Sequence, residues 1–158
     1  MTAALFDLND LAATEDFGRR LATHLFPGAV VALIGSLGAG KTNLVRAIAL
    51  GLDIPNPAVV NSPTFVLIQE YDARLPIYHF DAYRLTSESD FVALGVHEYF
   101  NEDGVCLIEW ADKFPGSLPG ERLEIRLTIT GEHSRRVEMV GTGPRYQSIV
   151  EAFPPLAA

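Results

Sequence analysis

The chain has 158 residues, of which 48% are hydrophobic and 20% charged, and its formal net charge is −8 at pH 7. These values suit a single domain over residues 1–158, and no stretch approaches the ~18 uninterrupted apolar residues of a membrane-spanning helix. The acidic balance, without a cluster of Lys and Arg, disfavours a protein that holds nucleic acid by itself. Residues 1–7 lack the basic and apolar regions of a secretion signal, so we expect a cytoplasmic protein.

The first third of the chain predicts a strand, a helix, a buried strand and a second helix. A short strand is predicted over residues 4–8, and an amphipathic helix follows near Thr14. Residues 29–34 are a continuous apolar run, as expected of a buried parallel strand. Residues 43–50 have helical spacing, and Gly51 stands where a C-terminal cap belongs.

Between this strand and helix, residues 35–42 read Gly-Ser-Leu-Gly-Ala-Gly-Lys-Thr and match G-x-x-x-x-G-K-[ST], the loop that wraps nucleotide phosphates. Its glycines let successive N–H groups point into one concave nest, to which the helix N-terminus adds its dipole. We expect the Lys41 charge on the β- and γ-phosphates and the Thr42 hydroxyl on Mg²⁺, which prefers oxygen ligands. The predicted nucleotide-binding residues of this segment are Gly35, Gly38, Ala39, Gly40, Lys41, Thr42 and Asn43.

The middle of the chain predicts a hairpin and a helix. Residues 65–71 and 77–81 have strand character, and their short connection is typical of an antiparallel hairpin. A helix is predicted from about Ser87 toward Phe100, with Gly95 as a candidate break.

The last third predicts another buried strand, a hairpin and a helix. Residues 105–108 are a second apolar run, and the single cysteine, Cys106, is expected to be buried there and inert. Residues 122–130 and 135–140 predict a closing hairpin, and a final helix is predicted to precede a frayed tail at about 154–158. The whole pattern indicates an α/β fold with parallel and antiparallel strands, in which ligands bind outside the carboxyl ends of the strands.

Two residues follow the second apolar run, at the edge where ligands are expected. Glu109 stands where phosphate-loop proteins place a second magnesium contact or a water-positioning carboxylate, although a solvated strand end is the alternative. Trp110 either flanks the nucleotide or fills the core. Thr14 and Arg135 are candidates for the periphery of the nucleotide, and their spacing alone does not single them out.

Further candidates lie around the predicted hairpin. Thr64, in Ser-Pro-Thr, either reaches the γ-phosphate side of the magnesium, as switch segments do, or belongs to a strand-entry turn. Alternation places His79 and Asp81 on one face of their strand. Asp81 is a candidate to orient the attacking water or a magnesium-bound water, whereas His79 is interpreted as a hydrogen-bonded core histidine.

Together these motifs resemble the TsaE family (also called YjeE), a small ATPase of bacterial tRNA modification, from about Thr14 to Arg136. The phosphate loop is shared by many nucleotide hydrolases, and the other blocks are more specific in this order. The blocks that carry the resemblance are residues 35–42, Ser62-Pro63-Thr64-Phe65, residues 78–85 (Tyr-His-Phe-Asp-Ala-Tyr-Arg-Leu), residues 95–100 and Cys106-Leu107-Ile108-Glu109-Trp110.

The resemblance implies a three-layer phosphate-loop fold with a mixed, mainly parallel central sheet and antiparallel additions. It implies ATP and Mg²⁺ as cofactors, with Thr42 and Glu109 near the metal, and catalytic roles for Lys41, Thr64, Asp81 and Glu109. It also implies two protein partners, TsaD and TsaB, whose complex transfers a threonylcarbamoyl group to an adenosine beside the tRNA anticodon. ATP hydrolysis would reset that complex, and tRNA would be contacted only through the partners.

Two loop positions depart from the usual family pattern. The family often has Asp where this chain has Ser36, and Thr where it has Asn43. Lys41 and Thr42 are intact, so nucleotide binding is expected to persist. The change at Asn43 is expected to alter the α-phosphate contact, which makes affinity the property to measure.

Two other functions use the same loop. A small-molecule kinase usually carries a mobile, arginine-bearing lid, and no Arg-rich insertion is present. A GTP-driven binding switch would fit a switch threonine at Thr64, but no Asn-Lys-x-Asp segment is present to read guanine. ATP is therefore favoured over GTP.

Overall fold

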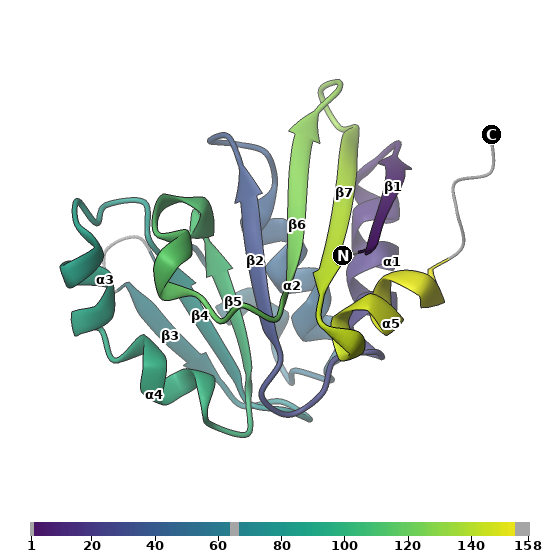
Figure 1. Cartoon of the computed structure of the whole chain (residues 1–158). Coiled ribbons are helices and arrows are strands. Elements are labelled where there is room, and N and C mark those ends of the chain that lie inside the picture. Colours follow the sequence, from purple (N-terminus) through teal and green to yellow (C-terminus); the bar gives the residue numbers. More distant parts are fainter. Residues whose placement is uncertain (1, 64–66, 154–158) are drawn as a thin grey trace.

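Seven strands hydrogen-bond into one sheet in the computed structural model, which describes residues 2–63 and 67–153 (Figure 1). Their order across the sheet is β1-β7-β6-β2-β5-β4-β3. The strands are β1 (Thr2–Leu8), β2 (Val30–Gly35), β3 (Ile68–Tyr71), β4 (Ile77–Asp81), β5 (Val105–Glu109), β6 (Arg122–Ile129) and β7 (Arg135–Thr142). The helices are α1 (Leu11–Ala22), α2 (Lys41–Gly51), α3 (Glu88–Ala93), α4 (Val96–Phe100) and α5 (Pro144–Ala152).

The centre of the sheet is parallel and its edges are antiparallel. β6, β2, β5 and β4 pair in parallel with their neighbours, whereas β3 pairs antiparallel with β4, and β7 pairs antiparallel with both β6 and β1. β2 and β5 read as unbroken apolar runs because they are covered on both faces, and they are buried over almost their whole length. The expected α/β fold and both expected hairpins are confirmed.

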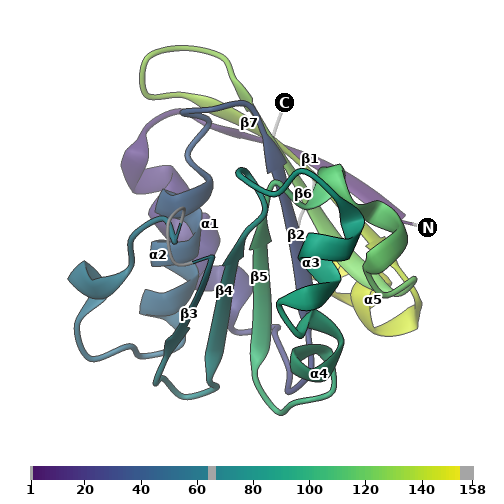
Figure 2. The same ribbon diagram turned by 90° about the vertical axis from the view of Figure 1, so that its left-hand side faces the viewer.

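Helices cover both faces of the sheet, which makes three layers (Figure 2). Alternate residues of β2 separate the two cores: Val31 and Leu33 belong to the core under α1 and α2, and Val30 and Ala32 to the core under α3 and α4. α5 joins the first core through Tyr146, Ile149 and Val150. The three-layer arrangement is confirmed, and it leaves the carboxyl ends of β2, β4 and β5 side by side at one edge.

Several element boundaries differ from the expectations. α1 begins at Leu11 because the Asp10 side chain caps it by accepting from the Ala13 amide, at 2.8 Å. The helix predicted from Ser87 is divided at Gly95 into α3 and α4. The expected tail at 154–158 and the predicted strand residues 65 and 66 lie outside the described residues.

Gly51 is the last residue of α2, not its C-terminal cap, so that expectation is wrong. The cap is Leu52, whose amide donates to the carbonyl of Ile48 at 3.0 Å. A Cβ atom at Gly51 would lie 2.8 Å from the Arg19 carbonyl oxygen of α1. This glycine is therefore needed for the close approach of α1 and α2.

Gly18 plays the same part on α1, and its replacement by alanine is expected to destabilise the protein. A Cβ atom there would overlap the Cβ of Ala47 and lie 3.0 Å from the Ala47 carbonyl carbon on α2. Overpacking of this kind costs about 1–3 kcal/mol, which exceeds or cancels the gain of about 1 kcal/mol in helix propensity. Urea unfolding of Gly18→Ala measures the net loss. Gly120→Ala is the control, because nothing lies within 4 Å of its added Cβ.

Cys106 lies on β5 with 1% of its surface exposed, and burial raises the pKa of its thiol to about 12. The thiol is therefore un-ionised at neutral pH, as expected of an inert core cysteine. Within residues 2–63 and 67–153, none of the helices has both the length and the apolar character needed to cross a bilayer.

Candidate functional site

The phosphate-loop motif forms the connection from β2 to α2, at the carboxyl end of the central strand. Gly38 and Gly40 have φ of 79° and 99°, in the left-handed region that residues with a side chain rarely adopt. The loop is also closed by its own hydrogen bond, from the Ala39 amide to the Ser36 carbonyl, at 3.0 Å. The sequence therefore places glycine where this backbone path requires it.

A hollow of about 460 Å³ lies beside this loop. Segments far apart in the chain meet there: the loop and the first turn of α2, the segment before β3, the end of β4 and the end of β5. The lining residues are Leu37, Gly38, Gly40, Lys41, Thr42, Asn43, Ser62, Asp81, Tyr83, Glu109 and Trp110. Most of the predicted site residues thus share one hollow.

Lys41 is held against the loop itself. Its ammonium group donates to the carbonyls of Gly35 at 2.6 Å and Ser36 at 2.9 Å, and it lies 4.1 Å from the centre of the Trp110 ring. Only 5% of the residue is exposed. Burial lowers the pKa of Lys41, opposed in part by the carboxylates of Glu109 and Asp81. A desolvated cation aimed along the loop is suited to bind an anion.

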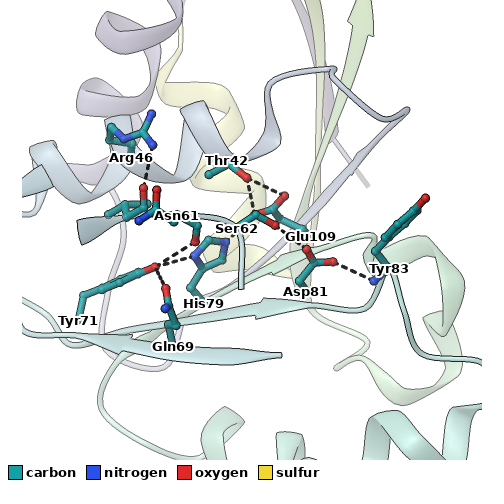
Figure 3. A network of polar contacts seen from close by, with 11 residues as sticks. Thr42, Arg46, Asn61, Ser62, Gln69, Tyr71, His79, Asp81, Tyr83 and Glu109 are labelled. Atoms are coloured by element: carbon teal, nitrogen blue, oxygen red, sulfur yellow. Dashed lines mark hydrogen bonds and ion pairs between the residues drawn. The ribbon is translucent and has the colours of Figure 1, made fainter. Parts of the chain in front are cut away.

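Glu109 and Thr42 are brought together, as the metal-site prediction requires (Figure 3). The Thr42 hydroxyl lies 3.1 Å and 3.0 Å from the two carboxylate oxygens of Glu109. Glu109 is 3% exposed, so the alternative interpretation as a solvated strand end is wrong. The reason is that β5 ends between β2 and β4, where neighbouring strands shield the side chain.

Asp81 pairs with Glu109 in the register of β4 and β5, and it is 2% exposed. Its carboxylate accepts from the Ser62 hydroxyl at 2.8 Å and from the Tyr83 amide at 2.8 Å (Figure 3). These two donors hold the carboxylate at the wall of the hollow. Thr64, two residues after Ser62, lies outside the described residues, so its role stays a prediction.

His79 is fully buried and hydrogen-bonded, which confirms its interpretation as a core histidine. Its Nε2 atom lies 2.6 Å from an oxygen of Glu109, and its Nδ1 atom lies 3.1 Å from the Tyr71 hydroxyl. Sequence reasoning did not connect His79 to Glu109. The one signal in the sequence that could have indicated this contact is the strand alternation, which places His79 on the same face as Asp81.

Trp110 lies at both the core and the hollow, so its interpretation as a core residue is supported and its place beside a nucleotide stays a prediction. Its ring packs at the border of the core under α3 and α4, lines the hollow, and lies 4.9 Å from the ring of Tyr83, measured between centroids. Its backbone has φ of 59°, which is uncommon for a residue with a side chain. This conformation turns the chain directly after Glu109, into the 3₁₀ helix Ala111–Lys113.

Arg135 contacts the phosphate loop from outside the hollow. From the start of β7, its guanidinium donates to the carbonyls of Ala39 at 2.9 Å and Gly38 at 3.3 Å. It also donates to the Gly131 carbonyl at 3.0 Å, within the β6–β7 turn. The side chain therefore braces the loop, a long-range contact that residue spacing did not indicate, and any contact with a nucleotide stays a prediction.

Thr14 does not line the hollow of the phosphate loop. It is buried on α1, and its hydroxyl lies 3.5 Å from the Asp10 carbonyl of its own helix. It borders a separate hollow of about 130 Å³, which Asn43 also lines. Asn43 thus lies between the two hollows, and a contact of Thr14 with a nucleotide stays a prediction.

A family model described as "Threonylcarbamoyl adenosine biosynthesis protein TsaE" matches residues 8–137. The chain belongs to the TsaE family. Its resemblance to that family is thereby confirmed. The family match spans the phosphate loop, the hairpin and the strand that ends in Glu109, and so covers all of the residues that line the hollow.

Curated members of the family are similar over most of their length. A TsaE protein of Bacillus subtilis is 43% identical over 139 residues, which are 87% of this chain and 85% of the relative. One of Haemophilus influenzae is 36% identical, covering 87% of this chain and 89% of the relative. One of Treponema pallidum is 40% identical, covering 78% of this chain and 90% of the relative. Each is described as a tRNA threonylcarbamoyladenosine biosynthesis protein.

A solved structure agrees with the fold. The crystal structure of Bacillus subtilis YdiB superposes with a TM-score of 0.81 at 35% sequence identity, covering 95% of this chain and 93% of that chain. The agreement therefore extends over the whole three-layer architecture, including the strands whose carboxyl ends form the hollow.

Proposed function

We propose that this protein binds ATP with Mg²⁺ and hydrolyses it weakly, as a cytoplasmic accessory subunit in the synthesis of threonylcarbamoyladenosine in tRNA. The observation that carries the proposal is the shared hollow. It is lined by the glycine-rich phosphate loop, by the buried Lys41 and by the buried carboxylates of Asp81 and Glu109. Membership of the TsaE family supports the pathway.

The loop and Lys41 would hold the phosphates. Lys41 now donates to two carbonyls of the loop, and phosphate oxygens would replace these as stronger, charged acceptors. The loop amides and the N-terminus of α2 would complete the anion site. Binding would thus move the ammonium group away from its present partners.

The residues at Thr42 and Glu109 fit a magnesium ion. Both side chains offer oxygen atoms, which this hard cation prefers. The Thr42 hydroxyl oxygen already lies 3.1 Å and 3.0 Å from the two carboxylate oxygens of Glu109. Magnesium is usually held by one or two protein ligands and completes its shell with phosphate oxygens and water. When bound, the ion would neutralise charge that develops on the phosphates during hydrolysis.

Asp81 would position the attacking water. Its carboxylate is fixed by Ser62 and Tyr83 at the wall of the hollow, and a carboxylate is the acceptor that such a water needs.

The proposed partners are a TsaD–TsaB complex, with tRNA contacted only through them. The formal net charge of −8 supports an auxiliary subunit that does not hold tRNA itself. A pull-down with purified TsaD and TsaB, with and without ATP, tests this directly. ATPase activity should rise in the mixture, and an absence of any complex would contradict the partnership.

The fluorescence of Trp110 is expected to change when ATP and Mg²⁺ bind. Trp110 is the single tryptophan of the chain, and the Lys41 ammonium group lies over its ring. Phosphates that draw the ammonium group away would change the electrostatic environment of the indole. A fluorescence titration, paired with calorimetry, gives the affinity. No binding in calorimetry would refute the proposal, and GTP competing as tightly as ATP would overturn the preference for adenine.

A further inference from the structure

We propose that His79 is a positioning residue, which orients the Glu109 carboxylate toward the magnesium side of the hollow. The inference rests on the proposed function, since it concerns how a metal-facing carboxylate is held. It is carried by a line of three side chains that crosses three neighbouring strands: Tyr71 on β3, His79 on β4 and Glu109 on β5 (Figure 3).

The contact between His79 and Glu109 has a defined direction. A carboxylate only accepts hydrogen bonds, so the Nε2 atom, 2.6 Å from the Oε2 atom of Glu109, carries the hydrogen in either protonation state of the ring. The Thr42 hydroxyl lies about equally far from both oxygens, at 3.0 Å and 3.1 Å, and has a single hydrogen to give. His79 is therefore the contact that distinguishes one carboxylate oxygen from the other.

The imidazole ring is itself fixed from the opposite side. Its Nδ1 atom lies 3.1 Å from the Tyr71 hydroxyl, which in turn lies 2.6 Å from the Oε1 atom of Gln69. A half-turn of the ring would place carbon atoms against both Tyr71 and Glu109. Because His79 is fully buried, water would not replace the lost contacts, so the observed orientation is strongly preferred.

This arrangement leaves Thr42 and Glu109 free to face the hollow. Glu109 is 3% exposed and lines the hollow together with Thr42. A carboxylate with one oxygen hydrogen-bonded to a buried histidine has little rotational freedom before any metal binds. Partners of this kind, one step behind a metal ligand, typically change metal affinity by about 10- to 100-fold when they are removed.

Two amide substitutions test the contacts of the two ring nitrogens of His79 separately. In His79→Gln, the amide nitrogen takes approximately the place of Nε2 and retains a donor to Glu109. In His79→Asn, the shorter amide takes approximately the place of Nδ1, keeps a polar group beside Tyr71 and leaves Glu109 without its donor. Both variants place a neutral amide in the same buried site, so they are matched for the general cost of replacing the ring.

The measurement is the affinity for ATP with Mg²⁺ and, separately, with EDTA. We expect His79→Asn to reduce the gain in affinity from Mg²⁺ by about 10- to 100-fold, with affinity in EDTA within about threefold of the wild type. His79→Gln should recover most of that gain. Tyr146→Phe, which removes a buried hydroxyl 3.0 Å from the Val30 amide, is the control for a lost buried hydrogen bond away from the site.

A second readout needs no substitution. The other histidines, His24, His97 and His133, are exposed, so their ring hydrogens exchange rapidly with water, whereas that of His79 is buried between two partners. The slowly exchanging imidazole signal should shift in proton NMR when Mg²⁺ is added to the protein with ADP. This result supports the proposal even if the variants do not fold.

Three results would overturn the inference. They are an unshifted imidazole signal, an unchanged magnesium effect in His79→Asn, and an equal loss of affinity with Mg²⁺ and with EDTA, which would reveal a purely structural role. A wild-type protein that binds no ATP would instead refute the proposed function. The two failures are therefore distinguishable.

Discussion

Replacing Lys41 with methionine is expected to weaken ATP binding on the order of 100-fold. Lys41 is 5% exposed and its ammonium group is hydrogen-bonded to two loop carbonyls, so the charge is largely desolvated and lies close to the expected place of the phosphates. A hydrogen bond to a charged group contributes about 1.5–3 kcal/mol, or roughly 10- to 150-fold in affinity. Methionine keeps an unbranched apolar side chain and removes the ammonium group, with its hydrogen bonds and its contact with the Trp110 ring. Calorimetric titration with ATP measures the loss.

The same substitution is expected to leave the thermal midpoint unchanged or to raise it. Without a phosphate, the buried ammonium group donates to two neutral carbonyls, and an apolar replacement of similar length avoids its desolvation cost. Arg136→Met is the control for lost positive charge, because this exposed side chain pairs with Asp7 away from the hollow. Unchanged affinity in Lys41→Met would show that the loop does not bind phosphates in the proposed way.

Replacing Asp81 with asparagine is expected to lower the rate of ATP hydrolysis by about 100- to 1,000-fold, with ATP affinity within about threefold of the wild type. Asparagine retains an oxygen that accepts from the Tyr83 amide, and its NH₂ group can donate to the Ser62 hydroxyl oxygen, so both contacts are kept. It removes the negative charge that positions and polarises the attacking water, a contribution made mainly in the transition state. Single-turnover hydrolysis with TsaD and TsaB present, together with calorimetry, separates the two quantities.

Asp103→Asn is the matched control, because Asp103 is exposed in the turn before β5, at the opposite end of that strand from Glu109, and does not line the hollow. It should leave both the rate and the affinity at wild-type values. Loss of affinity in Asp81→Asn as large as the loss of rate would mean that Asp81 holds the bound nucleotide or its metal instead of a water. Full activity in that variant would remove Asp81 from the mechanism.

The elements with strong local signals were predicted correctly. The apolar runs of β2 and β5, the hairpin of β3 and β4 and the phosphate loop are each encoded in a few contiguous residues. Boundaries were less accurate where packing decides them. Gly51 has the residue type of a helix cap, yet it lies inside α2 because α1 approaches it closely, and a local pattern contains no information about that neighbour.

The residues of the candidate site also differ in how far local sequence predicts them. Gly38, Gly40, Lys41 and Thr42 were identified from one segment, since a phosphate nest is made by successive amides of a single loop. Glu109 was predicted from its place after an apolar run, and Asp81 from the polar residues at the end of its predicted strand. Their near-complete burial, which decides against a solvated strand end, depends on strands that pair across the chain.

By itself, the sequence determined the phosphate loop, the α/β fold class and the strand ends where polar residues stand, because each of these follows from residues close together in the chain. The tertiary structure alone decided that Arg135 braces the loop, that Thr14 lies outside the hollow, and that His79 meets Glu109. Those contacts depend on the order of β3, β4 and β5 and on the closure of β7 beside the loop. Strand order is set by pairing between distant segments. The free energy of that pairing is distributed over the whole core, so a local motif does not predict it.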